Sequence, residues 1–208
     1  MPKLYYTATS CGAASFIAAK ASGLNWEVEQ VDIGSHRTLV GDVDYYTINP
    51  KGNVPCIVLD DGTVLNENVA TLSFIGMQGE NNPLYPNDPV ARAKINNALS
   101  YTSSEYHATV GNLFNPTLSE EVKAHFVAAA HRKLTYINDV LLKDNKFITG
   151  ENISVADFYL YITLTWTGYL QLDTSKYAAV EAYKKTMSEH PLVTAGQEAI
   201  AATPIHTN

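Results

Sequence analysis

Two cysteines are the side chains of this chain best suited to nucleophilic chemistry. Cys11 follows a strand pattern and directly precedes a helix pattern, where unpaired backbone N–H groups and the helix dipole favour a thiolate. Its alternative role is that of a small, unreactive core residue. Cys56 lies inside an apolar β pattern, which predicts burial. Tyr6, at the end of the first strand, can donate to a sulfur near Cys11 or simply pack against the sheet.

A second candidate centre is Glu67, at the start of a predicted helix. An acid there commonly just compensates the helix dipole. Alternatively, its carboxylate binds the ammonium of an amino acid while the helix N–H groups after Asn66 bind the carboxylate. Upstream, a cis Val54–Pro55 bond would leave the Val54 N–H and C=O available to a peptide-like ligand.

The third candidate centre is a group of polar side chains in the second half of the chain. Ser100, Ser104 and His107 are spaced four and three apart, which predicts that they share one helix face. A histidine side chain has an ordinary pKa near neutral, which suits His107 to catalysis, although a structural role is equally open to it. The other histidines show no ligand spacing with the cysteines or with one another, so we expect no metal site.

The N-terminal residues 1–78 follow an α/β pattern that positions Cys11 and Glu67. The first two strands flank a helix, so they form a βαβ unit and should be parallel. The later strands form an antiparallel hairpin that turns at Gly62. The predicted sheet is small, mixed and four-stranded. The predicted elements are strand 3–7, helix 13–21, strand 26–33, a short irregular helix within 34–48, strands 56–59 and 63–65, and helix 67–77.

The remaining chain is a proline-rich linker, 79–89, and an all-helical domain, 90–208. A capping box at Ser154 and Asp157 predicts the start of a buried helix. The predicted helices are 90–109, 120–142 after a Ser119 cap, the helix from Ser154, 177–187 and 193–201, followed by a loose tail, 203–208. Long helices of this kind are typical of a bundle.

The composition excludes several classes of function. The chain has 208 residues, 46% of them hydrophobic, which is enough for a packed core. Its net charge of -7 without a basic block excludes nucleic acid and an anionic membrane as main partners. No apolar run is long enough to span a bilayer, and two cysteines suit a reducing compartment, so we expect a cytoplasmic protein.

Together these motifs resemble the soluble glutathione S-transferases, and among them the bacterial beta class. The resemblance covers nearly the whole chain and depends on the order and spacing of six motifs. These are Leu4-Tyr5-Tyr6 with Cys11; Asn49-Pro50-Lys51-Gly52-Asn53-Val54-Pro55; Asp60-Asp61-Gly62-Thr63; Glu67; Glu105-Tyr106-His107; and Ile153-Ser154-Val155-Ala156-Asp157.

The resemblance implies a thioredoxin-like domain that binds glutathione beside cis-Pro55, followed by the helical domain. It implies catalytic roles for Cys11 and His107, and Tyr6 at the end of the first strand is the third catalytic candidate. It also implies an isologous homodimer, in which Glu105 can reach glutathione in the partner subunit. The implied glutathione-binding residues are Cys11, His36, Asn53, Val54, Pro55, Glu67, Asn68, Ser100, Ser104, Glu105 and His107. The hydrophobic co-substrate would contact Tyr106, Leu113, Phe114, Trp166 and Tyr169, all of which suit a core equally well.

Three departures from the class pattern weaken the implied glutathione contacts. His36 stands where the class often has a lysine that meets the glycine carboxylate, which predicts a weaker, pH-dependent contact. Asn68 replaces the usual Ser or Gly after the acid, and Ser100 replaces an Asn.

Two other functions stay open at this point. One is a glutathione-dependent thiol-disulfide transferase or peroxidase in which Cys11 itself cycles through a mixed disulfide. The other is a non-catalytic carrier of hydrophobic ligands with the same fold. Retention of Cys11, Val54-Pro55 and Glu67 favours an enzyme that activates the glutathione thiolate for attack on a hydrophobic electrophile, as in detoxification.

Overall fold

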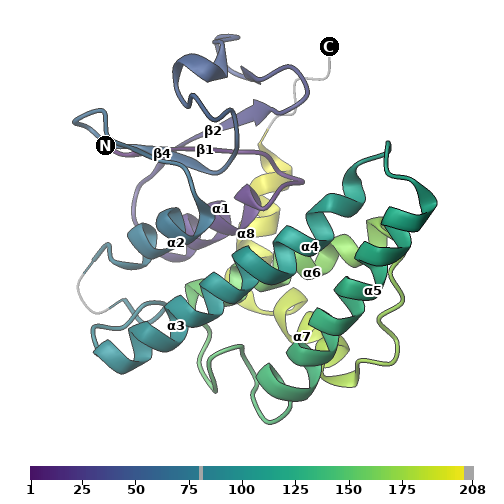
Figure 1. The fold of residues 1–208 in the computed structure, drawn as a ribbon. Coiled ribbons are helices and arrows are strands. Elements are labelled where there is room, and N and C mark those ends of the chain that lie inside the picture. The colour runs from purple at the N-terminus through teal and green to yellow at the C-terminus, as the bar shows by residue number, and fades with distance from the viewer. Residues whose placement is uncertain (80–81, 204–208) are drawn as a thin grey trace. The chain divides into compact units, whose positions relative to one another are not determined.

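The computed structural model describes residues 1–79 and 82–203. The chain forms two compact units. The first comprises residues 1–85 and the segment from His190 onward, and the second comprises Pro86–Glu189 (Figure 1). Residues 80–81 of the predicted linker and 204–208 of the predicted tail lie outside the described residues.

A mixed sheet forms the centre of the first unit. Its strands run in the order β3-β2-β1-β4-β5. The predicted parallel pairing of β1 and β2 is confirmed, with Leu4 opposite Val28, and β4 and β5 form the predicted antiparallel hairpin. A fifth strand, β3, pairs with β2 and was not predicted, because only two residues of a polar segment form it. The strands are β1 (Lys3–Tyr6), β2 (Glu27–Asp32), β3 (Arg37–Thr38), β4 (Cys56–Val58) and β5 (Val64–Leu65).

Alternation along β1 sends its side chains to two different cores. Leu4 and Tyr6 are fully buried, and the Tyr6 ring stacks on Phe16 of α1 with centroids 4.4 Å apart. Tyr5 belongs to the opposite cluster with Tyr45 and Cys56. Cys56 is therefore a core residue, as predicted. The helices of this unit are α1 (Gly12–Ala21), α2 (Asn68–Gly76) and α8 (Pro191–Ala202), with one 3-10 turn, Tyr45–Thr47.

The last helix, α8, packs against the first, α1 (Figure 1). This differs from the predicted helical domain, 90–208, because the segment from His190 onward belongs to the first unit. Gly196 permits the close approach, since a Cβ built there would lie 2.8 Å from Cγ1 of Ile17. Ile17 is fully buried, so it has little room to move aside.

Enlarging Gly196 should therefore separate α8 from α1. We expect Gly196→Val to lower the free energy of unfolding by about 3 kcal/mol, because overpacking a tight contact forces backbone shifts. Urea denaturation measures the change. The control is Gly168→Ala in α6 (Val155–Tyr169), where a Cβ would meet nothing within 4 Å and better helix propensity should preserve or raise stability. Equal loss in both variants would contradict the packing explanation.

In the described residues of the second unit, every helix or strand element is a helix. Its first long helix begins at the Asp88 cap and continues from α3 through a π-helical turn, Thr102–His107. The predicted Ser119 cap is confirmed, since its hydroxyl accepts the Val122 N–H at 3.4 Å. The helical segments are α3 (Pro89–Tyr101), the π-helical turn, α4 (Ala108–Val110), a 3-10 turn (Gly111–Phe114), α5 (Glu120–Tyr136) with a π-helical end (Ile137–Leu141), α6 and α7 (Ala178–Ser188).

The buried helix α6 begins with the predicted capping box. The Asp157 carboxylate accepts the N–H and the hydroxyl of Ser154 and the N–H of Ile148, each at 2.8 Å. The Tyr183 hydroxyl of α7 donates to the same carboxylate at 3.1 Å. One fully buried side chain thus ties together the start of α6, the preceding loop and α7.

Candidate functional site

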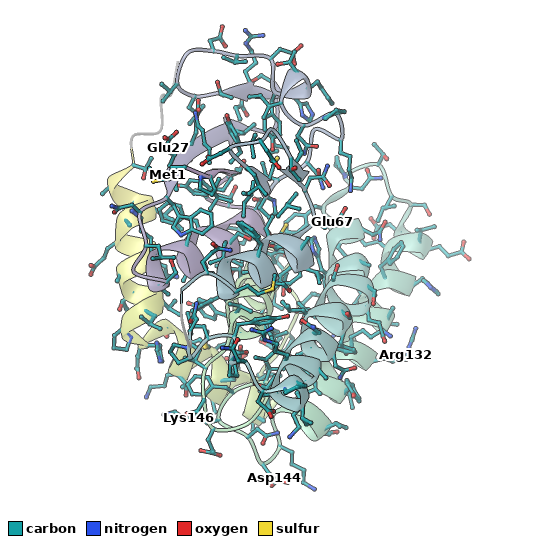
Figure 2. The ribbon with its side chains drawn as sticks, turned by 90° about the vertical axis from the view of Figure 1, so that its left-hand side faces the viewer. Met1, Glu27, Glu67, Arg132, Asp144 and Lys146 are labelled. Atoms are coloured by element: carbon teal, nitrogen blue, oxygen red, sulfur yellow. The ribbon has the colours of Figure 1, made fainter. Side chains whose placement is uncertain are left out.

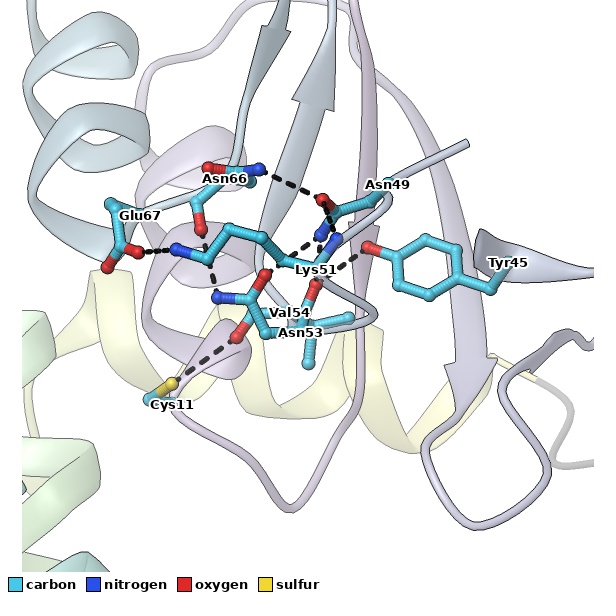
Figure 3. A network of polar contacts seen from close by, with 8 residues as sticks. All are labelled: Cys11, Tyr45, Asn49, Lys51, Asn53, Val54, Asn66 and Glu67. Carbon is cyan, nitrogen blue, oxygen red and sulfur yellow. Dashed lines mark hydrogen bonds and ion pairs between the residues drawn. The ribbon is translucent and has the colours of Figure 1, made fainter. Parts of the chain in front are cut away.

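Cys11 lies in the turn between β1 and α1, as its sequence position predicts. It is the residue before the first turn of α1, and its side chain is half-buried. Its thiol donates to the Val54 carbonyl at 3.5 Å (Figure 3). The structure thereby brings together two predicted site residues that are 43 positions apart in the chain.

The surroundings of Cys11 do not favour the expected thiolate. Burial raises the pKa of Cys11 to about 12, and the negative charge of Glu67 adds to the rise. The backbone N–H groups of Cys11 and Gly12 lower the pKa, but less than burial raises it. Desolvation of the thiolate therefore raises the pKa more than the N–H groups at the start of α1 lower it. At neutral pH the side chain is a thiol that donates a hydrogen bond.

The Val54–Pro55 peptide bond is cis, as predicted. Val54 is almost fully buried, and its carbonyl accepts from Cys11. Within the described residues, the Val54 N–H donates to no protein acceptor. The main chain at Val54 therefore keeps a donor available next to the thiol.

A buried asparagine network holds the loop that carries Val54 (Figure 3). Asn49 is fully buried, and its amide donates to the backbone carbonyl of Asn53 at 2.7 Å. Asn66 donates to the Asn49 side chain at 2.9 Å, and Asn53 donates to the Asn66 carbonyl at 3.1 Å. The Tyr45 hydroxyl also donates to the Asn53 carbonyl, at 2.9 Å. The loop before Val54 and the segment before α2 are thus bonded to each other.

Glu67 stands exposed at the N-terminal end of α2 (Figure 2). Its carboxylate forms an ion pair with Lys51, a residue that the sequence analysis did not single out. Asn68 begins α2, but its side chain is buried: it donates to the Cys11 carbonyl at 2.9 Å and accepts from Ser15. The amide side chains of Asn53 and Asn68 therefore support the loops that surround Cys11. The Asn68 N–H lies in the first turn, where no acceptor exists within the helix.

His36 lies in the loop between β2 and β3 with a left-handed backbone, φ 52°. Its ring stacks on Tyr46 with centroids 4.6 Å apart. Gly52 closes this cluster: its φ is 68°, and a Cβ there would lie 2.5 Å from the Tyr46 ring. The cluster thus joins the His36 loop to the loop before Val54.

Tyr6 does not fit its predicted catalytic role. It is fully buried, its ring lies on Phe16, and its hydroxyl faces Gln30 and Thr203. Strand alternation explains the difference, because Tyr6 shares the face of Leu4, which α1 and α8 cover. A ligand thiol beside Cys11 cannot reach a hydroxyl in that core.

In the second unit, His107 belongs to an aromatic cluster. Its Nδ1 lies 2.7 Å from the Tyr159 hydroxyl, and its ring packs edge-on against Trp166, with centroids 4.9 Å apart. Phe114 also packs edge-on against Trp166, with ring centroids 5.4 Å apart, and is half-exposed. Contacts from two aromatic residues hold the imidazole in one orientation.

The other predicted co-substrate residues are spread over different environments. Tyr106 is fully buried and is part of the core of its unit, which excludes direct contact with a co-substrate. Leu113 is half-buried beside Phe114, and Tyr169 is among the most exposed large side chains.

Ser100 and Ser104 share a helix face, as predicted, but His107 does not share it. Both serines line a groove of about 880 Å³ in the second unit, together with Glu105 and Arg132. The turn that contains Ser104 and His107 is π-helical, so the three-to-four spacing of an α-helix does not apply. Glu105 forms an ion pair with Lys133 at 2.5 Å.

In the parts of the chain that the structure describes, no group of three His, Cys, Asp or Glu side chains is arranged to hold a metal ion. Across the same residues, no helix has both the length and the apolar character needed to cross a membrane.

Comparison with known proteins gives consistent similarities. The family model "Glutathione S-transferase, C-terminal domain" matches residues 101–191. The chain is 35% identical over 201 residues to glutathione S-transferase GstA of Escherichia coli O157:H7, covering 96% of this chain and 98% of that protein.

Two solved structures share the fold over almost the full length. A sphingomonad glutathione S-transferase complexed with glutathione has a TM-score of 0.90 and 32% identity, covering 97% of this chain and all of that one (100%). A beta class glutathione S-transferase of Sphingomonas chungbukensis has a TM-score of 0.88 and 32% identity, covering 95% and 98%. The thioredoxin-like first unit and the helical second unit are thus both present in these relatives.

Proposed function

Because this chain belongs to the glutathione S-transferase family, we propose that Cys11, Val54 and Glu67 bind glutathione and that the enzyme directs its thiolate at a hydrophobic electrophile. The chain is a transferase with glutathione as co-substrate. The observation that carries the assignment to these residues is the contact between the Cys11 thiol and the Val54 carbonyl.

In this proposal the peptide main chain of glutathione pairs with Val54, which places the glutathione sulfur beside Cys11. The Val54 N–H supplies a donor, and the cis bond to Pro55 belongs to the same short segment. The Cys11 thiol donates a hydrogen bond to the glutathione thiolate, which stabilises the charged form of the ligand sulfur. Glu67 binds the ammonium of the γ-glutamyl group, and the first N–H groups of α2 bind the α-carboxylate of the same group. His36 binds the glycine carboxylate.

The second unit contributes the remaining groups of the proposed site. His107 interacts with the glutathione sulfur, and Phe114, Trp166, Leu113 and Tyr169 contact the electrophile. The orientation of His107 by Tyr159 and Trp166 supports a role for this histidine. Ser100, Ser104 and Glu105 lie at an accessible groove, which suits contact with glutathione bound by the partner subunit of a homodimer. A cytoplasmic location and a role in detoxification complete the proposal.

The thiol state of Cys11 disfavours the redox alternative. Attack on a disulfide requires a thiolate, whereas burial raises the pKa of Cys11 to about 12. A hydrogen-bond donor is the role that this environment favours.

Retention on immobilised glutathione, followed by a conjugation assay with a chlorinated dinitrobenzene, tests the proposal. We expect retention, elution by free glutathione, and turnover. Mixing two differently tagged copies and isolating both on one tag tests the homodimer. Retention without turnover of any electrophile would instead indicate a carrier, and absence of retention would contradict glutathione binding.

A further inference from the structure

The ion pair between Lys51 and Glu67 lies at the edge of the proposed glutathione site. Figure 3 shows Lys51 extending to Glu67 among the same group of polar contacts as Cys11 and Val54. The side chains of Lys51 and Glu67 are 49% and 58% exposed. An exposed pair of this kind contributes only about 0–1 kcal/mol to stability. Both charges can therefore exchange their partners at little cost.

The backbone beneath the two charges is held in place. The Lys51 N–H donates to the Asn49 side chain at 3.2 Å, and the Gly52 N–H donates to the Asn49 carbonyl at 2.8 Å. Asn66, next to Glu67, donates to the same Asn49 side chain at 2.9 Å. One buried asparagine thus fixes the spacing of the positive and the negative residue.

Two opposite charges at this spacing match an α-amino acid. The γ-glutamyl end of glutathione carries an ammonium and a carboxylate on one carbon atom. We propose that Lys51 is a further glutathione-binding residue: on binding, the Lys51–Glu67 pair opens, Glu67 takes the ammonium and Lys51 takes the α-carboxylate. This inference rests on the proposed function and adds to it the charge that balances the ligand carboxylate. No charge is left without a partner in the bound state.

The alternative is that Lys51 competes with the ligand ammonium for the Glu67 carboxylate. A competitor would have to be displaced by the ligand ammonium, so its removal would tighten binding. In our proposal its removal weakens binding, because the ligand carboxylate loses a charged hydrogen-bond partner. The sign of the change separates the two roles.

The test measures glutathione affinity by titration calorimetry in wild type, Lys51→Met and Lys51→Arg. Met keeps most of the length of the side chain without the charge. We expect Lys51→Met to raise the glutathione Kd roughly five- to tenfold and Lys51→Arg to restore most of the affinity. Lys143→Met, which removes an exposed lysine of the second unit, controls for net charge and should leave the Kd unchanged.

A glutathione analogue identifies the group that Lys51 contacts. 4-Aminobutyryl-cysteinyl-glycine has the ammonium but lacks the α-carboxylate, so Lys51→Met should change its Kd less than twofold. An equal loss for glutathione and analogue, an unchanged Kd, or tighter binding in Lys51→Met would overturn the Lys51 proposal while leaving the proposed function intact. Failure of the wild type to bind glutathione would overturn both.

Discussion

Asp157→Ala should lower the free energy of unfolding by about 4 kcal/mol or more. The substitution leaves the N–H groups of Ile148 and Ser154 without their acceptor in a dry core, and each lost acceptor costs about 1–3 kcal/mol. Urea denaturation at fixed protein concentration measures the loss. Asp144→Ala, which removes an exposed acid of the same unit, should stay within about 0.5 kcal/mol of wild type.

The stability contribution of Asp157 should also depend on pH. Burial raises the pKa of Asp157 to about 6, from an ordinary value of 3.8, although its four donors lower it. A raised carboxyl pKa means that the folded state favours the protonated form, so the contribution is fully present below pH 3.8 and is lost as pH rises through 6.

The stability gap between wild type and Asp157→Asn, which cannot titrate, should therefore shrink by about 2.4 kcal/mol between pH 4 and pH 7. A gap that widened with pH would show that the fold favours the carboxylate.

Cys11 should react with iodoacetamide about 1000-fold more slowly at pH 8 than an unperturbed cysteine. Alkylation requires the thiolate, and at a fixed pH of 8 a rise in pKa from 9.0 to about 12 lowers the thiolate fraction about tenfold for each unit of pKa. The rate should still increase about tenfold per pH unit between pH 8 and pH 10. Mass spectrometry of the Cys11 peptide measures it.

A Cys56→Ala variant restricts the reaction to Cys11, since Cys56 is also a thiol, with its pKa raised by burial to about 11. The same variant unfolded in urea supplies the unperturbed rate. A folded-state rate that levels off below pH 8 would contradict this prediction. It would mean that the N–H groups at the start of α1 lower the pKa of Cys11 more than burial raises it, so that Cys11 is a thiolate.

Local signals account for the parts of the fold that the sequence predicts. The turn at Gly62 predicts the hairpin, and the spacing of Ser154 and Asp157 predicts a capping box, because each depends on neighbours within a few residues. The cis Val54–Pro55 bond follows from the match of a whole motif. These features concern backbone geometry and are insensitive to distant packing.

The parts that the sequence did not predict depend on contacts between distant residues. Nothing near Cys11 in the chain indicates how far the thiol is desolvated, so the helix dipole alone suggested the wrong charge state. Alternation in β1 separates Tyr5 from Tyr6 but does not say which of them faces α1. Lys51 belongs to the motif Asn49–Pro55, but the sequence assigns it no role, because its partner Glu67 is 16 positions away.

The contact between α8 and α1 also determines when the first unit can be completed during synthesis. Ile17 is synthesised long before Gly196, because α1 and α8 lie far apart along the chain. Until α8 has been synthesised, the apolar surface of α1 around Ile17 remains uncovered. A gene fragment that ends at Tyr85 would carry the strands and the loops around Cys11, yet it would leave this apolar surface in water. The N-terminal segment alone therefore does not make up the first unit, whose folding also requires α8.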